Sequence, residues 1–279
     1  MTTEKVTLVR RILNLDRRLV IGLLVIFLVL PLLHPFALPV TVDAWTKAFY
    51  NRINSLPAGS TIVIGNEAQF TDYSELVPQM KPVYQQIFNQ KGLRFIAVCF
   101  SRPDCQIVFD TMVIPSMNQG DKKYGADWVD VGYLQGIETA MAAFAANFLY
   151  AGKDVHGTPL SSLPLMNEVK SMKDVKLFIV FGGQDFQPEL RQLGLPYNVP
   201  TIAGLQAVSF TDAQPYFSAG TIVGMINGLP GAAQYEYLAN MPGVGLASSD
   251  AITMGHMYLL ALIVITNIAF FVRRKGEKQ

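Results

Sequence analysis

The feature that most constrains this chain is an apolar run at residues 252–272, ITMGHMYLLALIVITNIAFFV. It contains no Asp, Glu, Lys or Arg, and Arg273, Arg274 and Lys275 follow it directly. Because an α-helix rises about 1.5 Å per residue, a helix of this length crosses the hydrocarbon core of a bilayer, which is about 30 Å thick. The run therefore predicts a transmembrane helix.

A second apolar run occupies residues 19–38 and begins directly after two arginines. A signal peptide also has a basic start, but its apolar core is shorter and it ends in small residues at a cleavage site. Here Pro31, Pro35 and Pro39 crowd the end of the run. We therefore expect an uncleaved anchor, with a signal peptide as the alternative.

Charge is distributed unevenly along the chain, whose formal net charge is +1. Residues 1–18 carry five basic and two acidic side chains, and residues 273–279 carry four basic and one acidic, so each flank has a net charge of +3. This leaves −5 for the residues between the flanks. Basic flanks stay on the cytoplasmic side of a membrane, so both termini are predicted to be cytoplasmic. The acidic middle argues against nucleic-acid binding, which needs a basic footprint.

These patterns predict a two-pass protein of the cell membrane, in contact with membrane lipid, whose main domain is extracytoplasmic. Its predicted parts are a cytoplasmic basic segment at residues 1–18, a first transmembrane helix at 19–38, an extracytoplasmic α/β domain at 39–251, a second transmembrane helix at 252–272 and a cytoplasmic basic tail at 273–279.

The middle of the chain alternates short apolar runs with helical patterns. Short, continuously apolar runs are typical of strands that are buried on both faces of a parallel sheet. The predicted strands lie at residues 61–65, 93–100, 127–134, 175–181 and 199–205. This alternation predicts a Rossmann-like α/β fold, an open and mostly parallel sheet with flanking helices.

The segments between these strands are predicted to be mostly helical. Helices are predicted at residues 73–91, 105–118, 137–150 and 221–240, the last interrupted at 228–231. A juxtamembrane helix is predicted within residues 40–59, where Trp45 and Tyr50 are typical of a membrane interface. Residues 209–220 are predicted to be a loop. Residues 151–174 are either a surface excursion or a short helix.

In sheets of this kind, ligands bind beyond the carboxyl ends of the strands. Polar residues follow three of the predicted strands, and three of them are carboxylates. The candidate ligand-binding residues are Asn66, Glu67, Arg102, Asp104, Gly182, Gly183, Gln184 and Asp185. The structural alternative is that glycine and aspartate occur here only because turns and helix caps favour them, without any ligand.

Specific cofactor motifs are missing from the sequence. It has neither G-x-G-x-x-G nor G-x-x-x-x-G-K-[ST], so no nucleotide cofactor is expected. No Cys/His spacing typical of a metal site occurs, so no metal is expected. The two cysteines, Cys99 and Cys105, either form a disulfide or are unrelated, and the sequence leaves both readings open.

Catalytic candidates are weak. Cys105 begins a predicted helix, whose amino terminus favours the thiolate, and His156 is the one histidine outside the apolar runs. A Cys105–His156 dyad, or the carboxylate pair Glu67 and Asp185, would make the chain a membrane-anchored hydrolase. Neither pattern is specific, so an enzyme is not the favoured reading.

The favoured reading is a non-catalytic scaffold or accessory subunit of a membrane complex, which includes a homo-oligomer. The second apolar run carries small and polar residues, Gly255, Ala261 and Asn267, which favour contact between the two apolar runs, self-association, or contact with a protein partner within the membrane. The main alternative is a membrane-tethered binder of a small extracytoplasmic ligand.

Overall fold

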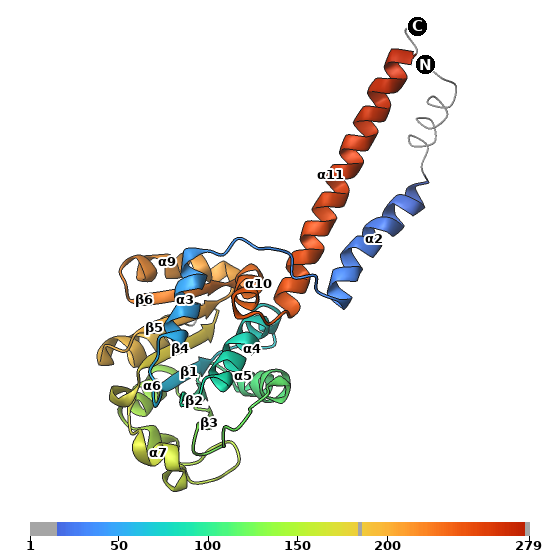
Figure 1. Cartoon of the computed structure of the whole chain (residues 1–279). Coiled ribbons are helices and arrows are strands. Elements are labelled where there is room, and N and C mark those ends of the chain that lie inside the picture. The colour runs from blue at the N-terminus through green and yellow to red at the C-terminus, as the bar shows by residue number, and fades with distance from the viewer. Residues whose placement is uncertain (1–15, 184–185, 277–279) are drawn as a thin grey trace. The chain divides into compact units, whose positions relative to one another are not determined.

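The computed structural model describes residues 16–183 and 186–276 (Figure 1). Two of the candidate site residues, Gln184 and Asp185, lie outside the described residues, as does most of the basic segment predicted at 1–18. The chain divides into two compact units. We call residues 1–38 with 242–279 the helical unit, and residues 39–241 the α/β unit.

The helical unit contains two long helices, α2 (Arg17–Leu33) and α11 (Val244–Gly276). Among the described residues, only the stretch Val244–Val272 is long and apolar enough to cross a membrane. This helix begins at Val244, earlier than the predicted start at residue 252. The 17 residues of α2 span about 26 Å at 1.5 Å per residue, slightly less than a hydrocarbon core.

The two helices of this unit pack against each other and run antiparallel. The Tyr258 hydroxyl donates a hydrogen bond to the Val20 carbonyl oxygen at 2.7 Å, and its ring stacks on Phe27 with 5.3 Å between centroids. One turn away, Gly255 lets Leu28 approach closely, since a Cβ on Gly255 would lie 2.9 Å from Leu28 Cδ2. The two apolar segments therefore contact each other within one chain.

The α/β unit is built on a six-stranded sheet in the order β3-β2-β1-β4-β5-β6, with every neighbouring pair parallel. The strands are β1 (Thr61–Asn66), β2 (Arg94–Cys99), β3 (Trp128–Tyr133), β4 (Leu177–Gly182), β5 (Thr201–Leu205) and β6 (Ile222–Asn227). This confirms the predicted α/β fold. Every residue of β1, β4 and β5 is buried, which explains why these runs are continuously apolar.

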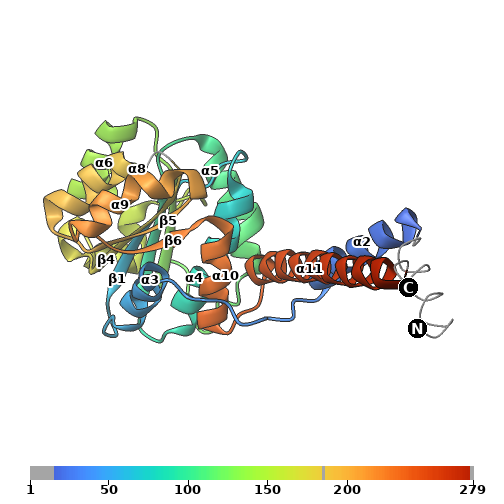
Figure 2. The same ribbon diagram turned by 90° about the horizontal axis from the view of Figure 1, so that it is seen from above.

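Helices cover both faces of the sheet (Figure 2). On one face Val63 packs in a core with α6, α8 and α9, while its neighbours Ile62 and Ile64 point into a second core with α3, α4 and α10. The helices are α3 (Ala44–Asn54), α4 (Tyr73–Asn89), α5 (Pro103–Val108), α6 (Ile137–Ala146), α7 (Pro164–Glu168), α8 (Phe186–Glu189), α9 (Phe210–Ser218) and α10 (Gly228–Ala239). A π-helical turn, Phe109–Val113, continues α5.

The helix predicted at residues 221–240 is wrong in its first part. Residues Ile222–Asn227 form the edge strand β6, and only the following residues form α10. Gly228 separates the two elements with a positive φ of 53°, a conformation that favours glycine. Gly224 allows α3 to cross β6 directly, because a Cβ there would lie 2.6 Å from Phe49 Cα.

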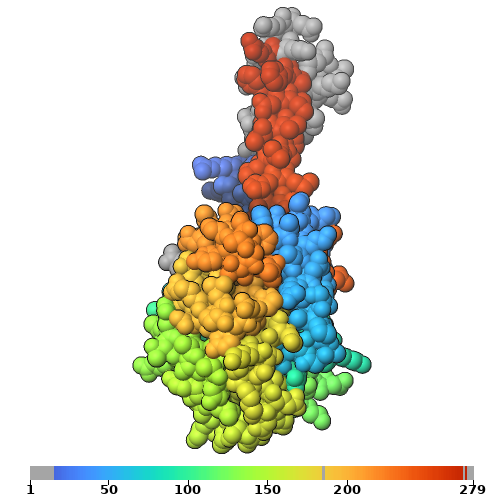
Figure 3. Space-filling view, turned by 90° about the vertical axis from the view of Figure 1, so that its left-hand side faces the viewer, coloured from blue at the N-terminus to red at the C-terminus, as the bar shows by residue number. Residues whose placement is uncertain are grey.

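Two other predictions also need correction. The predicted loop at 209–220 contains α9, and the predicted juxtamembrane helix is α3, a core helix of the α/β unit. Phe49 and Ile53 are fully buried, and the ring of Trp45 lies 5.1 Å from that of Phe210. Figure 3 shows the α3 segment, in blue, beside the orange segment of β6 and α9. An apolar stripe looks the same in sequence whether it faces a core or a membrane.

Residues 151–174 contain only short helical elements. They form α7 and 3-10 turns at Phe148–Ala151, Leu160–Ser162 and Met172–Asp174. The backbone N–H of Val155 donates to the Asp130 carbonyl oxygen at 3.2 Å, so part of this segment covers the edge strand β3. Covering an edge strand prevents it from pairing with another chain.

Candidate carboxyl-edge site

The order in which strands are added to the sheet changes direction between the parallel neighbours β1 and β4. In the order 3-2-1-4-5-6 the first three strands extend one way from β1 and the last three extend the other way from β4, so the connections diverge between these neighbours. In open α/β sheets this switch point opens a crevice beyond the carboxyl ends of the strands. We call the loops that follow the strands on this side the carboxyl edge.

Four of the predicted residues meet at the switch point. Asn66 ends β1 and pairs in register with Phe181, so Glu67 follows β1 beside Gly182 and Gly183 at the end of β4. The Glu67 N–H donates to the Phe181 carbonyl oxygen at 2.7 Å, and a Cβ on Gly182 would lie 3.5 Å from Glu67 Cβ. The structure therefore places the ends of these two strands together.

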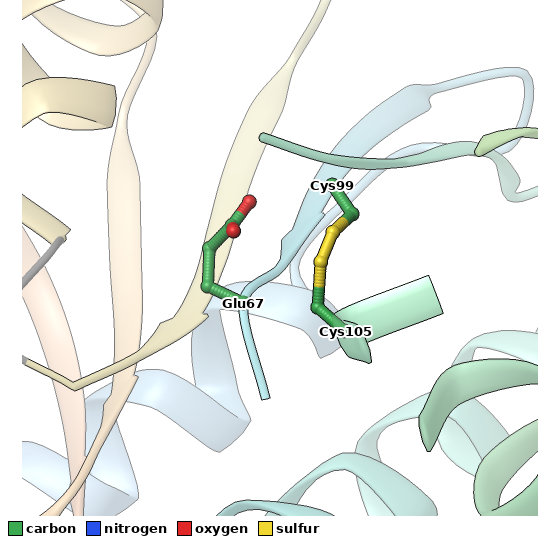
Figure 4. Close-up of side chains that lie close together, drawn as sticks. All are labelled: Glu67, Cys99 and Cys105. Carbon is green, nitrogen blue, oxygen red and sulfur yellow. A yellow bond between two sulfur atoms is a disulfide. The ribbon is translucent and has the colours of Figure 1, made fainter. Parts of the chain in front are cut away.

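Glu67 is buried and ties β1 to the neighbouring loop. One of its carboxylate oxygens accepts a hydrogen bond from the Phe100 N–H at 2.8 Å, and the other accepts one from the Ser101 N–H at 2.7 Å. The carboxylate lies beside the disulfide that joins Cys99 and Cys105 (Figure 4). Both oxygens of Glu67 are thus engaged by the backbone of the loop that follows β2.

Asn66 and the predicted pair Arg102 and Asp104 also have local partners. The Asn66 Oδ1 atom accepts from the Tyr84 hydroxyl at 2.7 Å, and burial raises the pKa of Tyr84 well above its usual value. Asp104 accepts from the Phe70 N–H at 3.2 Å and pairs with the Arg102 Nε at 3.2 Å. Asp104 therefore links the loops that follow β1 and β2, and Arg102 extends into solvent.

Three acidic residues of the carboxyl edge were missed by the sequence reasoning. Asp72 Oδ1 accepts from the Gln69 N–H at 2.6 Å, and Glu75 Oε2 accepts from the Ala207 N–H at 2.9 Å, which ties α4 to the loop after β5. Both residues occupy the start of α4, a position where acidic residues are common. The third, Glu189, is fully buried against Gly65 of β1, a contact between distant segments that no local pattern signals.

The carboxylates of this edge therefore bond mainly to backbone N–H groups. Glu67, Asp72, Glu75 and Asp104 each accept at least one such bond, and together these bonds join the loops after β1, β2 and β5. The bond from Phe100 to Glu67 is buried, and a buried hydrogen bond to a charged acceptor stabilises a loop more than the exposed bonds to Glu75 and Asp104 do. Chemically, this arrangement holds the loops in place rather than presenting free acid groups.

The structure places the two residues of the predicted dyad in different surroundings. Cys105 is bonded to Cys99, with 6.4 Å between their Cα atoms, so it carries no thiolate in this form. His156 is exposed, and its ring lies 4.8 Å from that of Tyr124. Its backbone N–H donates to Asp154 Oδ1 at 3.0 Å. Neither residue has the partner that nucleophilic catalysis by a Cys–His pair needs.

A second acidic cluster lies away from the switch point, at β3. The Gln106 side-chain amide donates to Asp130 Oδ2 at 2.7 Å and to Asp110 Oδ1 at 2.9 Å, so one amide group joins two carboxyl groups. Burial, reinforced by the nearby Asp110, raises the pKa of Asp130 to about 7, although the hydrogen bond from Gln106 acts in the other direction. No pattern in the sequence pointed to this cluster.

Five large apolar side chains are exposed on the segments of the carboxyl edge. Large hydrophobic residues with more than two fifths of their surface exposed occur in the loops or first helical turns that follow β1, β2, β3 and β5. They are Phe70, Tyr73, Ile107, Ile137 and Val208. The edge thus combines loops that are fixed by carboxylates with these five exposed apolar side chains, which we call the apolar rim.

No family model, curated protein or solved structure matches this chain.

Proposed function

We propose that this chain is a non-catalytic scaffold or accessory subunit of a membrane complex, and that its carboxyl edge contacts another protein. The apolar rim carries this proposal, because exposed large apolar side chains on one edge of a domain favour protein–protein contact. Two of its members, Phe70 and Tyr73, belong to the aromatic class that is enriched in interfaces. The carboxylates of the same edge already accept hydrogen bonds from backbone N–H groups, so the edge is suited to protein contact rather than to acid–base chemistry.

The proposed setting is a two-pass protein whose termini are cytoplasmic and whose α/β unit is extracytoplasmic. Three observations support it: the antiparallel contact between α2 and α11, the basic residues at both flanks, and a disulfide, which is typical of oxidising compartments. In sealed right-side-out vesicles, a membrane-impermeant maleimide should label Tyr150→Cys directly and Arg274→Cys only after permeabilisation. The reverse pattern would contradict this orientation.

Native mass spectrometry of the full chain, extracted from its own membrane in mild detergent, tests the proposed assembly. We expect one defined large species, which is either homomeric or contains a second protein. The double variant Phe70→Ser/Val208→Ser should release the chain as a monomer, because it removes two members of the apolar rim.

A matched control removes apolar surface elsewhere on the α/β unit. Tyr150 and Leu195 are about half exposed and lie outside the carboxyl edge. The variant Tyr150→Ser/Leu195→Ser should keep the wild-type mass. A monomeric wild type, or an assembly that survives the rim variant unchanged, would refute the proposed role.

A second candidate function is the binding of a small extracytoplasmic ligand at the switch point. The strand order favours it, because the crevice between β1 and β4 is the usual ligand position in such sheets. A thermal-shift screen tests it, since a ligand that binds the folded state raises the melting temperature by mass action. A monomer that carries a bound small molecule in the mass spectrum would favour this function over the scaffold.

A further inference from the structure

Four potential metal ligands meet where β2 ends. The Sγ atoms of Cys99 and Cys105 and a carboxylate oxygen of Glu67 all lie within 4.8 Å of one another, and the three side chains are buried. The carbonyl oxygen of Arg102 lies 2.6 Å from Cys105 Sγ and 3.3 Å from Cys99 Sγ. Figure 4 shows that Glu67 approaches the two cysteines from a separate segment.

We propose that these four donors bind one Zn²⁺ ion when the Cys99–Cys105 disulfide is reduced, and that disulfide formation closes the site. Zn²⁺ in proteins prefers four ligands in a tetrahedron and accepts thiolate, carboxylate and other oxygen donors. Two thiolates favour a thiophilic ion over Mg²⁺ or Ca²⁺, which take oxygen ligands. The site lies outside the apolar rim and goes beyond the proposed function, since in the proposed oxidising compartment it opens only when the disulfide is reduced.

The backbone geometry suits this coordination. Zinc–sulfur bonds of about 2.3 Å in a tetrahedron place two sulfur atoms about 3.8 Å apart, so the sulfurs of a reduced pair need only side-chain rotation to reach this spacing. The two Cα atoms are 6.4 Å apart and can stay in place. The Glu67 carboxylate oxygen lies within 4.8 Å of both sulfur atoms. An ion between the three atoms can therefore form a zinc–oxygen bond of about 2.0 Å with Glu67.

Outer hydrogen bonds already orient the carboxylate. The N–H groups of Phe100 and Ser101 donate to the two oxygens of Glu67, and each oxygen keeps a second lone pair for the ion. Such bonds to a ligating group are typical of protein metal sites, and losing a partner costs about 10- to 100-fold in affinity. Here they come from the loop that carries both cysteines.

Charge balance also favours a divalent ion. Two thiolates and one carboxylate carry three negative charges in a buried place, and an ion of charge +2 offsets most of them. A buried group of like charges is costly without a counter-charge. The Arg102 guanidinium already pairs with Asp104 and does not neutralise the two thiolates and Glu67. Zn²⁺ is the cation suited to these three buried groups.

A phosphine gives two electrons to the disulfide and becomes the phosphine oxide with oxygen from water, while the sulfurs take up two protons. Zn²⁺ then displaces these two protons and binds both thiolates. An added small-molecule disulfide reverses this step: the two protein thiolates form the Cys99–Cys105 bond, the reagent takes up their two electrons and two protons to become two thiols, and the ion is released. In an oxidising compartment the site is therefore closed, and the ion binds the reduced chain alone.

Titration of the full chain in detergent with Co²⁺, a coloured substitute for Zn²⁺, tests this site. After reduction with a phosphine, we expect one Co²⁺ per chain with a sulfur-to-metal charge-transfer band in the near ultraviolet, and Zn²⁺ should abolish the band. The oxidised chain should show no band. A reduced wild type without stoichiometric binding would overturn the proposal.

Variants identify the ligands. Cys99→Ser and Cys105→Ser should each abolish the charge-transfer band or halve its intensity, and Glu67→Gln should weaken Zn²⁺ binding tenfold or more. Asp121→Asn is the matched control, because Asp121 is an exposed carboxylate outside the donor set, and its affinity should equal that of the wild type. Tryptophan fluorescence confirms that each variant is folded. Unchanged binding by both cysteine variants would refute the site, and the comparison of oxidised with reduced wild type decides the question even where a variant does not fold.

Discussion

The carboxylate of Glu189 lies against the backbone of Gly65. A Cβ atom built on residue 65 would lie only 2.9 Å from Glu189 Cδ. Glu189 ends α8 and is fully buried, and Gly65 is the fifth residue of β1. The contact therefore joins β1 to the segment that follows β4, on the two sides of the switch point. Gly65 is needed there because any side chain would occupy the place of the carboxylate.

Gly65→Ala should destabilise the α/β unit by about 2–3 kcal/mol, because a new Cβ must displace a buried carboxylate from a packed position. Both tryptophans, Trp45 and Trp128, lie in the α/β unit, so fluorescence during urea unfolding of the full chain reports on this unit. Gly182→Ala is the matched control, since its Cβ would make an ordinary 3.5 Å contact and should cost less than about 1 kcal/mol. Equal costs for both variants would contradict the assigned contact.

Much of the fold follows from local patterns. Strand β1 was predicted to within one residue and β4 to within two, because both are short apolar runs that end in glycine or a polar residue. Strand β6 was missed because its run, IVGMIN, was assigned to the same helical pattern as α10, although Gly228 and Pro230 interrupt that pattern. Helix α3 was placed at a membrane interface because Trp45 and Phe49 form the same stripe in either setting.

The site was predictable in position but not in its bonding. Glu67 and Gly182 were expected at one edge because parallel strands bring their carboxyl ends together. Which N–H group each carboxylate accepts depends on the register of distant loops, as with Glu67 and Ser101. Glu189 and Asp130 were missed for the same reason, since their partners lie far away in the sequence.

The raised pKa of Asp130 predicts that stability falls as the pH rises. The folded-state pKa of about 7 exceeds the ordinary value of 3.8, so between these values the folded state binds more protons than the unfolded state. Stability from this group is complete below about pH 4, declines as the pH rises toward 7, and then stays level. The full difference is on the order of 4 kcal/mol, at 1.36 kcal/mol for each pKa unit.

Urea midpoints measured by tryptophan fluorescence between pH 4.5 and 8 test this dependence. Asp130→Asn should remove most of the slope, because the amide does not titrate. Asp110→Asn should shift the decline to lower pH, since it removes the neighbouring negative charge that helps to raise the pKa of Asp130. A slope that persists unchanged in Asp130→Asn would assign it to another group.

The Cys99–Cys105 disulfide should stabilise the α/β unit by about 2 kcal/mol, as expected for a short closed loop. Reduction with a phosphine in the presence of a metal chelator should therefore lower the urea midpoint of the wild type. The double variant Cys99→Ala/Cys105→Ala should start from the lower midpoint and show no response to the phosphine. A wild type that responds no more than this variant would show that the disulfide contributes nothing to stability.

Asp250 should hold the end of α2 against α11 within the helical unit. Its buried carboxylate accepts hydrogen bonds from the N–H groups of Phe36, Ala37 and Leu38 at 2.7, 2.9 and 3.1 Å. Ala37 has a positive φ of 51°, which is costly without such partners. Asp250→Ala leaves three backbone donors without their acceptor, and should destabilise the helix pair by about 3 kcal/mol.

Spin labels measure this effect directly. Ile21 and Met257 are exposed on α2 and α11, and the native cysteines are held in their disulfide, so labels on Ile21→Cys and Met257→Cys report the distance between the two helices alone. The distance distribution should be narrow in the wild-type background and broad with Asp250→Ala. Ser248→Ala, two residues earlier in α11, should leave it narrow. A narrow distribution in Asp250→Ala would mean that the Tyr258–Val20 and Gly255–Leu28 contacts suffice to pair the helices.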